Sequence, residues 1–456
     1  MAMGFSVEGW RVTVVGAARS GLAAAELLVS RGASVTLSEA RDTFADAARM
    51  RGIGVRLELG GHEGATLRAS DLIVLSPGVP LDQPAVAEAR AAGVPVIAEI
   101  ELASRWLRGR IVAITGTKGK STTTTLTTRM LQASGVPARA GGNIGEPLSA
   151  QVAASTPETV HVVEVSSFQL ESADTFHPTI AALLNFSADH LDRHPTLEAY
   201  ARAKARIFGR QTADDWAVLN ADDPDSARLA AEARSRRRWF GFAGIGDGVT
   251  VAAGRIVERD AGRETPLLPA AAVKVPGRHT LSDVLAAAAV SRLAGASIAG
   301  VAQAAAAFRG IEHAMELAGE VEGVRFVNDS KATTVGSARW AIESVDPPLA
   351  VIVGGRHKAG DFGDLAGVLS GRARAVVAIG EAAPRIVERL EGVVPVSIAG
   401  SMGEAVRTAF EAVRPAGTVL LAPACSSFDM FADFADRGRR FKEEVARLAA
   451  DAARRG

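Results

Sequence analysis

The sequence predicts an α/β protein of three domains, each built on a mostly parallel sheet with flanking helices. Its 456 residues are enough for about three domains of ordinary size. Short β-branched runs alternate with Ala- and Leu-rich helical segments along the chain, and this alternation is typical of parallel sheets. Glycine or polar residues follow several of the predicted strands, where ligands collect in open α/β sheets.

The first predicted domain is Rossmann-like and spans residues 1–105. Residues 12–16 read as a strand, the turn to Gly21 is glycine-bounded, and residues 22–30 read as a helix that Gly32 ends. A second strand at residues 34–38 completes a βαβ unit. Further strands are predicted at residues 55–59, 72–75 and 95–98.

A central domain that resembles P-loop ATPases is predicted at residues 106–310, and a second Rossmann-like domain at residues 311–456. The predicted central strands are residues 111–115, 161–165, 180–184 and 217–219, and residues 280–294 read as a helix. Residues 241–273 are glycine-rich with short β-like runs, which predicts an antiparallel appendage. The predicted third-domain strands are residues 325–327, 350–353, 375–379 and 418–421.

Composition excludes several classes of protein. Lys and Arg number 51, as do Asp and Glu, so the net charge is zero and no basic footprint for nucleic acid is expected. Cys425 is the single cysteine, which rules out an intrachain disulfide and favours a cytoplasmic setting. No apolar run approaches the roughly 20 residues of a membrane span, and no signal peptide is recognisable. We therefore expect no membrane partner.

Residues 111–125, IVAITGTKGKSTTTT, are the most informative segment. A β-branched run ends in a glycine loop at residues 116–119 and leads into a helix, so loop amides and the helix N-terminus can surround phosphate oxygens. Lys120 can reach terminal phosphates, and the Ser121 or Thr122 hydroxyl can bind Mg²⁺. The spacing is shorter than in the Walker A pattern, and an ordinary strand-to-helix turn is the alternative. We predict an ATP site.

Other strand ends of the first two domains are candidate sites. The turn from Gly16 to Gly21 lacks the middle glycine of a dinucleotide fingerprint, although Glu39 follows the second strand as a ribose-binding acid would. It is either a plain βα turn or a cradle for a nucleotide diphosphate. Residues 76–78, Ser-Pro-Gly, end another predicted strand and could border the same pocket.

Three central-domain residues are candidate metal or catalytic groups. Glu164 ends a buried-type strand near the phosphate loop, where an acid could hold Mg²⁺. His190 follows the strand at residues 180–184, and a metal or substrate contact is favoured over a buried structural histidine. Lys204 lies in a segment whose spacing indicates a solvated basic helix face.

Polar residues also follow three strands of the third domain, at residues 328–333, 354–358 and 422–429. A lysine among acceptors in the first segment suits anionic oxygens, although Asp329 or Ser330 could equally cap the next helix. An exposed basic turn is the alternative for the second segment. In the third, Cys425 is expected to be a small buried hydrophobe and not a nucleophile.

Together these segments resemble the Mur ligase family over essentially the whole chain. The phosphate loop, Glu164 and His190 resemble the whole superfamily, which includes folylpolyglutamate synthases. Residues 166–171 (SSFQLE), 328–333 (NDSKAT) and 424–429 (ACSSFD) resemble the glutamate-adding members more narrowly.

The resemblance implies a role for each matching residue. ATP would be bound by Gly116, Thr117, Lys118, Gly119, Lys120, Ser121, Thr122, Asp283, Asp329 and Lys331. The UDP-linked substrate would be bound by Arg19, Ser20, Ser76, Gly78, Asn143, Ser166 and Gln169. Glutamate would be bound by Thr333, Lys358, Ser427 and Phe434. Lys120, Glu164, His190 and Lys204 would be catalytic, and two Mg²⁺ ions would be held by Ser121, Glu164, His190 and a carbamylated Lys204.

The chain departs from the family pattern at three places. In the family, a segment with two asparagines contacts adenine, and the matching residues 277–283, GRHTLSD, contain neither asparagine. Asp283 could still accept a hydrogen bond from an exocyclic amine. His313 is followed by Ala314 where the family often has arginine. Lys118 replaces a common asparagine and adds positive charge to the phosphate loop.

The implied activity is ATP-dependent amide-bond formation through an acyl phosphate. D-Glutamate would be added to UDP-N-acetylmuramoyl-L-alanine in cytoplasmic peptidoglycan precursor synthesis, by a monomer. An L-glutamate-adding variant or a ligase like folylpolyglutamate synthase is the alternative. A non-catalytic nucleotide-binding module and a dehydrogenase are further alternatives, which amino-acid-dependent phosphate release and NADH titration would separate.

Overall fold

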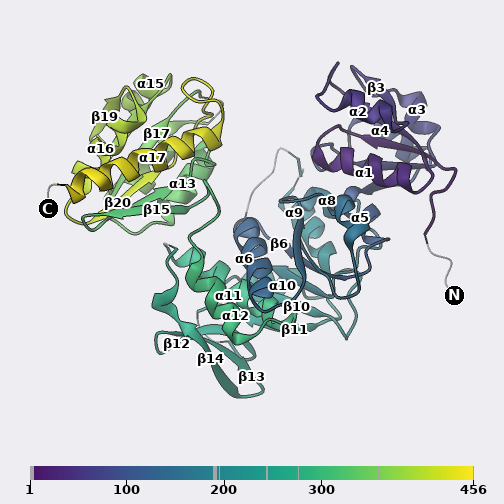
Figure 1. The fold of residues 1–456 in the computed structure, drawn as a ribbon, viewed down its shortest axis with the longest axis horizontal. Coiled ribbons are helices and arrows are strands. Elements are labelled where there is room, and N and C mark those ends of the chain that lie inside the picture. Colours follow the sequence, from purple (N-terminus) through teal and green to yellow (C-terminus); the bar gives the residue numbers. More distant parts are fainter. Residues whose placement is uncertain are drawn as a thin grey trace. The chain divides into compact units, whose positions relative to one another are not determined.

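A computed structural model of the chain describes residues 5–187, 193–194, 196–242, 245–275, 277–357 and 360–454 (Figure 1). The described residues form three separate, mostly parallel sheets with flanking helices, as the sequence predicts. The backbone divides into two compact units, Met1–Ala271 with Ser282–Ala305 and Ala272–Leu281 with Ala306–Gly456. The first unit contains two of the sheets and the second unit contains one. The three domain boundaries stay predictions.

The N-terminal sheet is wholly parallel, with strand order β3-β2-β1-β4-β5. Its strands are β1 (Arg11–Val15), β2 (Ser34–Glu39), β3 (Arg56–Leu59), β4 (Leu72–Leu75) and β5 (Val96–Ala98). The helices are α1 (Arg19–Ser30), α2 (Ala47–Gly52), α3 (Gly64–Arg68), α4 (Pro84–Ala91) and α5 (Glu99–Ser104). A side chain at Gly21 would collide with the Gly16 carbonyl and the Ser76 hydroxyl, so the glycine turn packs tightly against the end of β4.

The central sheet has nine strands in the order β14-β13-β12-β11-β10-β9-β6-β8-β7. They are β6 (Arg110–Thr115), β7 (Ala138–Gly142), β8 (Val160–Glu164), β9 (Ile180–Leu183), β10 (Trp216–Asn220), β11 (Arg236–Phe240), β12 (Gly248–Ala252), β13 (Arg255–Asp260) and β14 (Arg263–Pro269). The associated helices are α6 (Lys120–Ala133), α7 (Leu148–Gln151), η1 (Val152–Ala154), α8 (Ser167–Glu171), α9 (Leu197–Ala205), η2 (Arg206–Phe208), α10 (Pro224–Leu229), η3 (Ala270–Ala272), α11 (Arg278–Leu293) and α12 (Ile298–Ala307).

The predicted antiparallel appendage at residues 241–273 is only partly right. β13 pairs antiparallel with both β12 and β14, as expected. However, β12 pairs in parallel with β11, so these strands continue the main sheet and do not form a separate element. Strand β11 was not predicted from the sequence because its residues, Arg-Arg-Arg-Trp-Phe, lack the β-branched pattern of a buried strand.

The third sheet has the order β15-β16-β20-β17-β18-β19, and only β15 runs antiparallel to its neighbour. Its strands are β15 (Glu316–Val321), β16 (Val324–Asn328), β17 (Leu349–Gly354), β18 (Ala373–Ile379), β19 (Val396–Ala399) and β20 (Gly417–Leu421). The helices are α13 (Val335–Glu343), η4 (Phe362–Leu365), α14 (Ala366–Leu369), α15 (Ala383–Leu390), α16 (Met402–Val413) and α17 (Phe434–Ala453).

Both faces of the third sheet are covered, which explains why β17 is apolar throughout. Val351 and Val353 pack in a core with α13 and α15, whereas Ala350 and Ile352 pack in a second core with α16 and α17. A strand that is buried on both faces reads as a continuous hydrophobic run. Since β20 pairs in parallel with both β16 and β17, the carboxyl ends of these three strands lie side by side at one edge of the sheet.

Candidate active site

The predicted phosphate loop joins β6 to α6 as a glycine-bounded turn. Gly119 precedes the helix with a φ of +81°, in the left-handed region that favours glycine, and no described side chain caps the helix start. The first turn of α6 therefore presents uncapped amide groups and the positive end of the helix dipole. An anion can bind at such a helix start.

Asn185 holds the phosphate loop in place from the end of the neighbouring β9. Its Oδ1 accepts hydrogen bonds from the amides of Thr117 (3.1 Å) and Lys118 (2.9 Å), and its Nδ2 donates to the Lys118 carbonyl (3.1 Å). No role for Asn185 was predicted from the sequence. Its position directly after a buried strand of the same sheet was the available signal.

Two lysines approach the phosphate loop from different helices. Lys120 Nζ, at the start of α6, donates to the carbonyls of Gly116 and Thr117, both at 3.0 Å. Lys204 Nζ, from α9, donates to the Gly116 carbonyl at 2.7 Å and lies 4.7 Å from the centroid of the Tyr200 ring. Lys204 is 1% exposed, so the solvated helix face that its spacing indicated is wrong. Tertiary packing of α9 against the loop overrides the helical pattern.

A carboxylate meets the first turn of α6 from the end of β8. Glu164 is buried, and its Oε2 accepts a 2.7 Å hydrogen bond from Ser121 Oγ. Its Oε1 accepts a 3.0 Å bond from Asn143 Nδ2. Three of the predicted residues, from α6, β8 and the segment after β7, are therefore in contact.

Oxygen donors of this kind suit Mg²⁺, which prefers carboxylate and hydroxyl ligands. The described residues contain no cluster of three His, Cys, Asp or Glu side chains that could hold a metal ion by itself. A bound ion would therefore need phosphate oxygens or water as well. His190, predicted as a further ligand, lies outside the residues that the structure describes.

Asp283 places a second acid against the phosphate loop. A Cβ atom at Gly119 would collide with the Asp283 carboxylate, which shows how closely this side chain of α11 approaches the loop. Desolvation raises the pKa of the buried Asp283 carboxyl well above its usual value. A protonated carboxyl there would not repel a phosphate, and the predicted contact with adenine stays a prediction.

The residues predicted to bind the UDP-linked substrate gather around the N-terminal glycine turn and α8. Arg19 donates a hydrogen bond to the Gly145 carbonyl, and Ser76 Oγ donates to the Gly16 carbonyl at 2.8 Å. Ser76 and Gln169 line one small cavity. Ser20 follows Arg19 in the first turn of α1, Gly78 is exposed, and Ser166 caps α8.

Gln169 shows an unused hydrogen-bonding group. Its Oε1 accepts from the Ser166 amide at 3.0 Å, whereas its buried Nε2 has no partner among the described residues. A buried donor without a partner is costly, and a ligand oxygen could satisfy it.

Glu39 is turned toward the glycine turn at the end of β2. Its Oε2 accepts a 2.7 Å hydrogen bond from the Ala17 amide, and its Oε1 accepts from Arg41 Nε at 3.0 Å. The side-chain hydrogen bond from Arg41 is the main cause that lowers the pKa of Glu39 to about 2. Ribose binding by this acid stays a prediction.

The second unit brings its predicted polar segments to one edge of its sheet. The buried Asp329 accepts a 3.2 Å hydrogen bond from the Met315 amide, and desolvation raises its pKa to about 7. Lys331 is exposed, and Thr333 is half-buried. Ser427 follows β20 and is 2% exposed, whereas Phe434 begins α17 and is 40% exposed. Lys358 lies outside the described residues.

Cys425 and His313 are both buried in the second unit. Cys425 is wholly buried, and desolvation raises its thiol pKa to about 12, so the expected inert small hydrophobe is confirmed. His313 is also buried, and its Nδ1 lies 3.0 Å from Asn328 Nδ2. The histidine therefore packs against the end of β16, beside the position where the family's arginine is replaced by Ala314.

Three domain models of one protein family match this chain, one after the other along the sequence. Residues 10–98 match the Mur ligase MurD-like N-terminal domain, residues 114–291 the Mur ligase middle domain, and residues 315–425 the Mur ligase glutamate ligase domain. A UDP-N-acetylmuramoylalanine--D-glutamate ligase of Acidobacterium capsulatum is 46% identical over 446 residues, which are 96% of each chain. The chain belongs to the Mur ligase family. An enzyme of the same name from Chlorobaculum parvum is 43% identical, over 97% of this chain and 99% of that protein.

Solved Mur ligases share the fold at lower identity. UDP-N-acetylmuramate-alanine ligase MurC of Thermotoga maritima matches 96% of this chain and 99% of its own, with a TM-score of 0.58 and 20% identity. MurF ligase of Thermotoga maritima, solved in complex with ADP, matches 99% of this chain and 96% of its own, with a TM-score of 0.56 and 17% identity. These likenesses confirm the predicted α/β fold of three domains.

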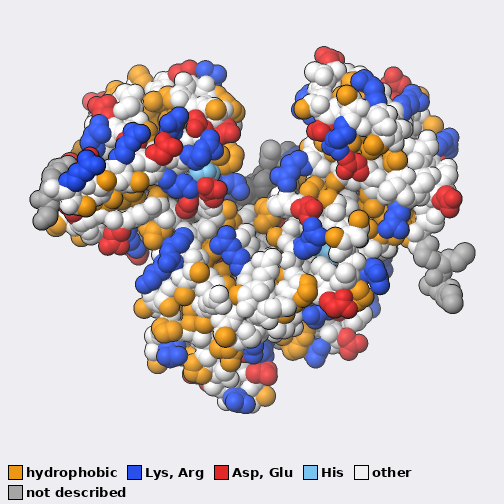
Figure 2. Space-filling model, viewed as in Figure 1, with side chains coloured by type: hydrophobic (Ala, Val, Ile, Leu, Met, Phe, Trp, Pro, Cys, Tyr) orange, Lys and Arg blue, Asp and Glu red, His pale blue; other side chains and the backbone are white. Residues whose placement is uncertain are grey.

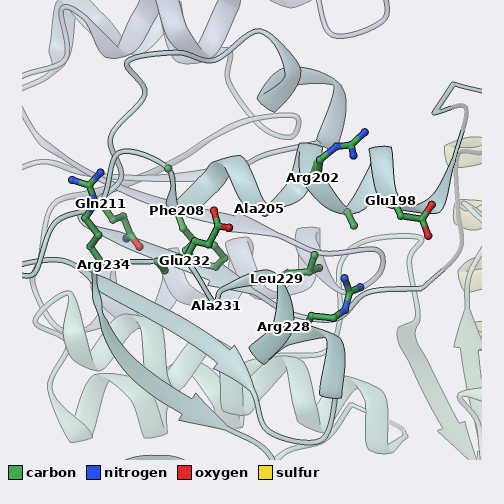
Figure 3. A pocket seen from close by; sticks show the side chains of 13 residues that line it. Glu198, Arg202, Ala205, Phe208, Gln211, Arg228, Leu229, Ala231, Glu232 and Arg234 are labelled. Carbon is green, nitrogen blue, oxygen red and sulfur yellow. The ribbon is translucent and has the colours of Figure 1, made fainter.

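Two further features lie outside the predicted site. A cavity of about 600 Å³ lies between α9, η2 and α10, and none of the predicted site residues lines it (Figure 3). Among the described residues, no helix is long and apolar enough to cross a membrane.

Proposed function

We propose that this Mur ligase uses ATP to add D-glutamate to UDP-N-acetylmuramoyl-L-alanine in peptidoglycan precursor synthesis. Relatives that are 40–46% identical over nearly their whole length bear the name UDP-N-acetylmuramoylalanine--D-glutamate ligase, and this supports the acceptor and the amino acid. The contact between Ser121 and Glu164 at the start of α6 carries the proposal structurally, because it places a hydroxyl and a carboxylate beside the phosphate loop.

The chemistry requires activation of a carboxylate, since the carbon of a carboxylate is a poor electrophile. Transfer of the ATP γ-phosphoryl group to the alanyl carboxylate would give an acyl phosphate and ADP. The glutamate amine would then attack the acyl carbon, and the tetrahedral intermediate would collapse to an amide and inorganic phosphate as the amine loses its proton. Most of the protein's contribution would be positioning and charge stabilisation.

Lys120 and the uncapped start of α6 would bind the triphosphate. The Lys120 ammonium donates to the carbonyls of Gly116 and Thr117, and rotation of its side chain would turn it toward the phosphates. Thr117, Lys118 and Thr122 would complete the loop, with Asp283, Asp329 and Lys331 on the rest of the nucleotide. Such preorganised donors act where charge develops during transfer.

The same residues fit a role for magnesium. We propose that Ser121 and Glu164 hold one Mg²⁺ ion, and that His190 and a carbamylated Lys204 hold a second. Bound there, the metal would offset the negative charge of the phosphates. Lys204 fits the carbamate because it is buried beside the loop, within 2.7 Å of the Gly116 carbonyl.

The remaining predicted residues would hold the other two substrates. Arg19, Ser20, Ser76 and Gly78 would hold the UDP group, and Asn143, Ser166 and Gln169 the muramoyl part. Thr333, Lys358, Ser427 and Phe434 would hold glutamate. We further propose a cytoplasmic monomer that needs neither nucleic acid nor membrane.

Phosphate release tests the proposed function directly. The protein is incubated with ATP, Mg²⁺ and UDP-N-acetylmuramoyl-L-alanine, with D-glutamate, with L-glutamate or without amino acid, and a parallel series uses a folate acceptor. We expect release that depends on D-glutamate and on the UDP-linked acceptor. Release with L-glutamate would indicate the alternative enantiomer, and release with folate a folylpolyglutamate-synthase-like ligase. No release in any series would contradict an amide ligase.

A further inference from the structure

Arg437, in the first turn of α17, lies wholly buried among oxygen atoms of the second unit. Its Nε donates to Ser330 Oγ at 2.9 Å, and its Nη2 donates to the Ser330 carbonyl at 2.9 Å and to the Cys425 carbonyl at 3.1 Å. Its Nη1 donates to the Cys425 carbonyl at 3.1 Å and to the Gly354 carbonyl at 3.4 Å. One guanidinium thus joins the chain at the ends of β16, β17 and β20.

These three strand ends lead into the segments predicted to bind nucleotide and glutamate. Ser330 lies next to Asp329 and Lys331, and Ser427 is two residues beyond Cys425. Ser330 Oγ also donates to the Phe434 carbonyl at 2.7 Å, which ties the start of α17 to the same cluster. A shift of the guanidinium would therefore move the predicted amino-acid and nucleotide contacts of this unit together.

Arg437 differs from the other arginines of α17 because its charge is buried and is not paired with any carboxylate that the structure describes. Arg439, Arg440 and Arg447 are more than half exposed and pair with acids three residues away, and Figure 2 shows Lys and Arg along this helix with acidic side chains between them. By contrast, no carboxylate among the described residues accepts a hydrogen bond from Arg437.

Arg437 nevertheless stays protonated at neutral pH. Desolvation lowers the pKa of its guanidinium to about 10, and Asp429 offsets part of this effect. A buried cation that is solvated only by carbonyl and hydroxyl dipoles keeps a positive potential around itself. Such a potential attracts an anion at the neighbouring surface.

The backbone leaves room for this side chain. Gly355 has a φ of +129°, and a Cβ atom there would collide with the Ser426 carbonyl and would also lie 3.2 Å from Arg437 Nη1. The strand end after β17 is thus shaped so that the guanidinium can reach three carbonyls at once.

We propose that Arg437 is the positioning residue of the amino-acid site. It holds the chain segments at three strand ends in fixed positions, and it supplies the buried positive charge that attracts an incoming dicarboxylate. This inference rests on the proposed function, in which glutamate, with two carboxylates, binds to the second unit. Arg437 would not touch the amino acid, since its donors are already used by Ser330, Gly354 and Cys425.

Steady-state kinetics of four variants test this role. Arg437→Met removes the charge and the hydrogen bonds, and Arg437→Lys keeps the charge. Ser330→Ala removes the acceptor of Nε with little change in volume. Arg440→Met is the matched control, because Arg440 is an exposed arginine one turn further along the same helix. Each protein is measured for kcat, for the KM of D-glutamate, ATP and the UDP-linked acceptor, and for Tm.

We expect Arg437→Met to raise the KM for D-glutamate tenfold or more, and the KM for the UDP-linked acceptor by less than twofold, because that acceptor's predicted contacts lie in the first unit. The KM of Arg437→Lys for D-glutamate should be at least threefold lower than that of Arg437→Met. Ser330→Ala should raise the KM for D-glutamate two- to fivefold over the wild type. Arg440→Met should match the wild type.

Several outcomes would overturn the proposal. A fall in kcat or Tm for Arg437→Met with every KM unchanged would show a purely structural arginine. Equal KM values for Arg437→Lys and Arg437→Met would remove the role of charge. If Arg437→Met does not fold, an unchanged D-glutamate KM in both Arg437→Lys and Ser330→Ala is decisive against it. A wild type without D-glutamate-dependent phosphate release would instead refute the proposed function.

Discussion

Ser121 Oγ lies 2.7 Å from Glu164 Oε2, so the first turn of α6 is joined to the end of β8 by a hydroxyl–carboxylate hydrogen bond. Glu164 is 2% exposed and also accepts from Asn143, which comes from the segment after β7. The contact connects the loop that would bind phosphate with the acid that would bind metal. It also shows that a buried carboxylate can be satisfied by neutral donors alone.

Glu164→Gln should weaken magnesium binding with little loss of stability. The amide is isosteric and can keep a hydrogen bond to Ser121 or Asn143, but it removes the negative charge that a divalent cation needs. We expect the Mg²⁺ concentration for half-maximal phosphate release to rise roughly tenfold or more, as ligand changes do at metal sites. A magnesium titration of wild type and variant, with Tm as a check on folding, measures this. An unchanged titration would remove Glu164 from the metal site.

Lys120→Met should abolish most of the activity while the fold remains intact. The Lys120 ammonium donates to the carbonyls of Gly116 and Thr117 at the phosphate loop, and methionine keeps most of the aliphatic length of the side chain. Loss of a charge that stabilises phosphoryl transfer should lower kcat by roughly 10²–10³-fold. Phosphate release and binding of an ATP analogue are measured together. Lys118→Asn, which restores the family's common residue, is the control and should stay within severalfold of the wild type.

The contacts just described divide into those that the sequence predicted and those it could not. The glycine loop, Lys120 and Glu164 were predictable because local pattern alone places them after buried strands of one parallel sheet. The burial of Lys204 was not, since helical spacing does not say which face packs against a loop. Arg437 was missed for a related reason, because its acceptors lie on segments that local pattern does not bring together. Asn185, by contrast, follows a buried strand of the central sheet, so its position could have been used to predict it.

Lys204→Met should lower kcat by roughly 10²-fold if the residue works at the phosphate loop. The control lies on the same helix: Arg202→Met changes an exposed side chain that lines the cavity in Figure 3, and its activity should equal that of the wild type. A carbamate can be observed independently, because ¹³C-bicarbonate should give a carbamate NMR signal in the wild type that Lys204→Arg lacks. A full-activity Lys204→Met enzyme would contradict the role, and an active wild type without the signal would contradict only the carbamate.

Glu99→Gln should stabilise the protein at high pH and have little effect at low pH. Glu99 begins α5 and is 1% exposed; its Oε1 accepts a 2.6 Å hydrogen bond from the Ser149 amide, and its Oε2 has no partner among the described residues. Desolvation raises the pKa of this carboxyl from 4.5 to about 7. The folded state therefore holds the proton more tightly than the unfolded state does, so stability falls as the pH rises from about 4.5 to about 7.

A shift of that size corresponds to about 3 kcal/mol at most. Thermal unfolding at pH 5 and pH 8 tests the sign: the Tm advantage of Glu99→Gln over the wild type should appear at pH 8 and shrink at pH 5. Glu101→Gln is the matched control. The Glu101 carboxylate accepts hydrogen bonds from the backbone amides of Asp174, Thr175 and Phe176, so its replacement should lower Tm at pH 8. An advantage of Glu99→Gln that is equal at both pH values would show that ionisation of Glu99 does not limit stability.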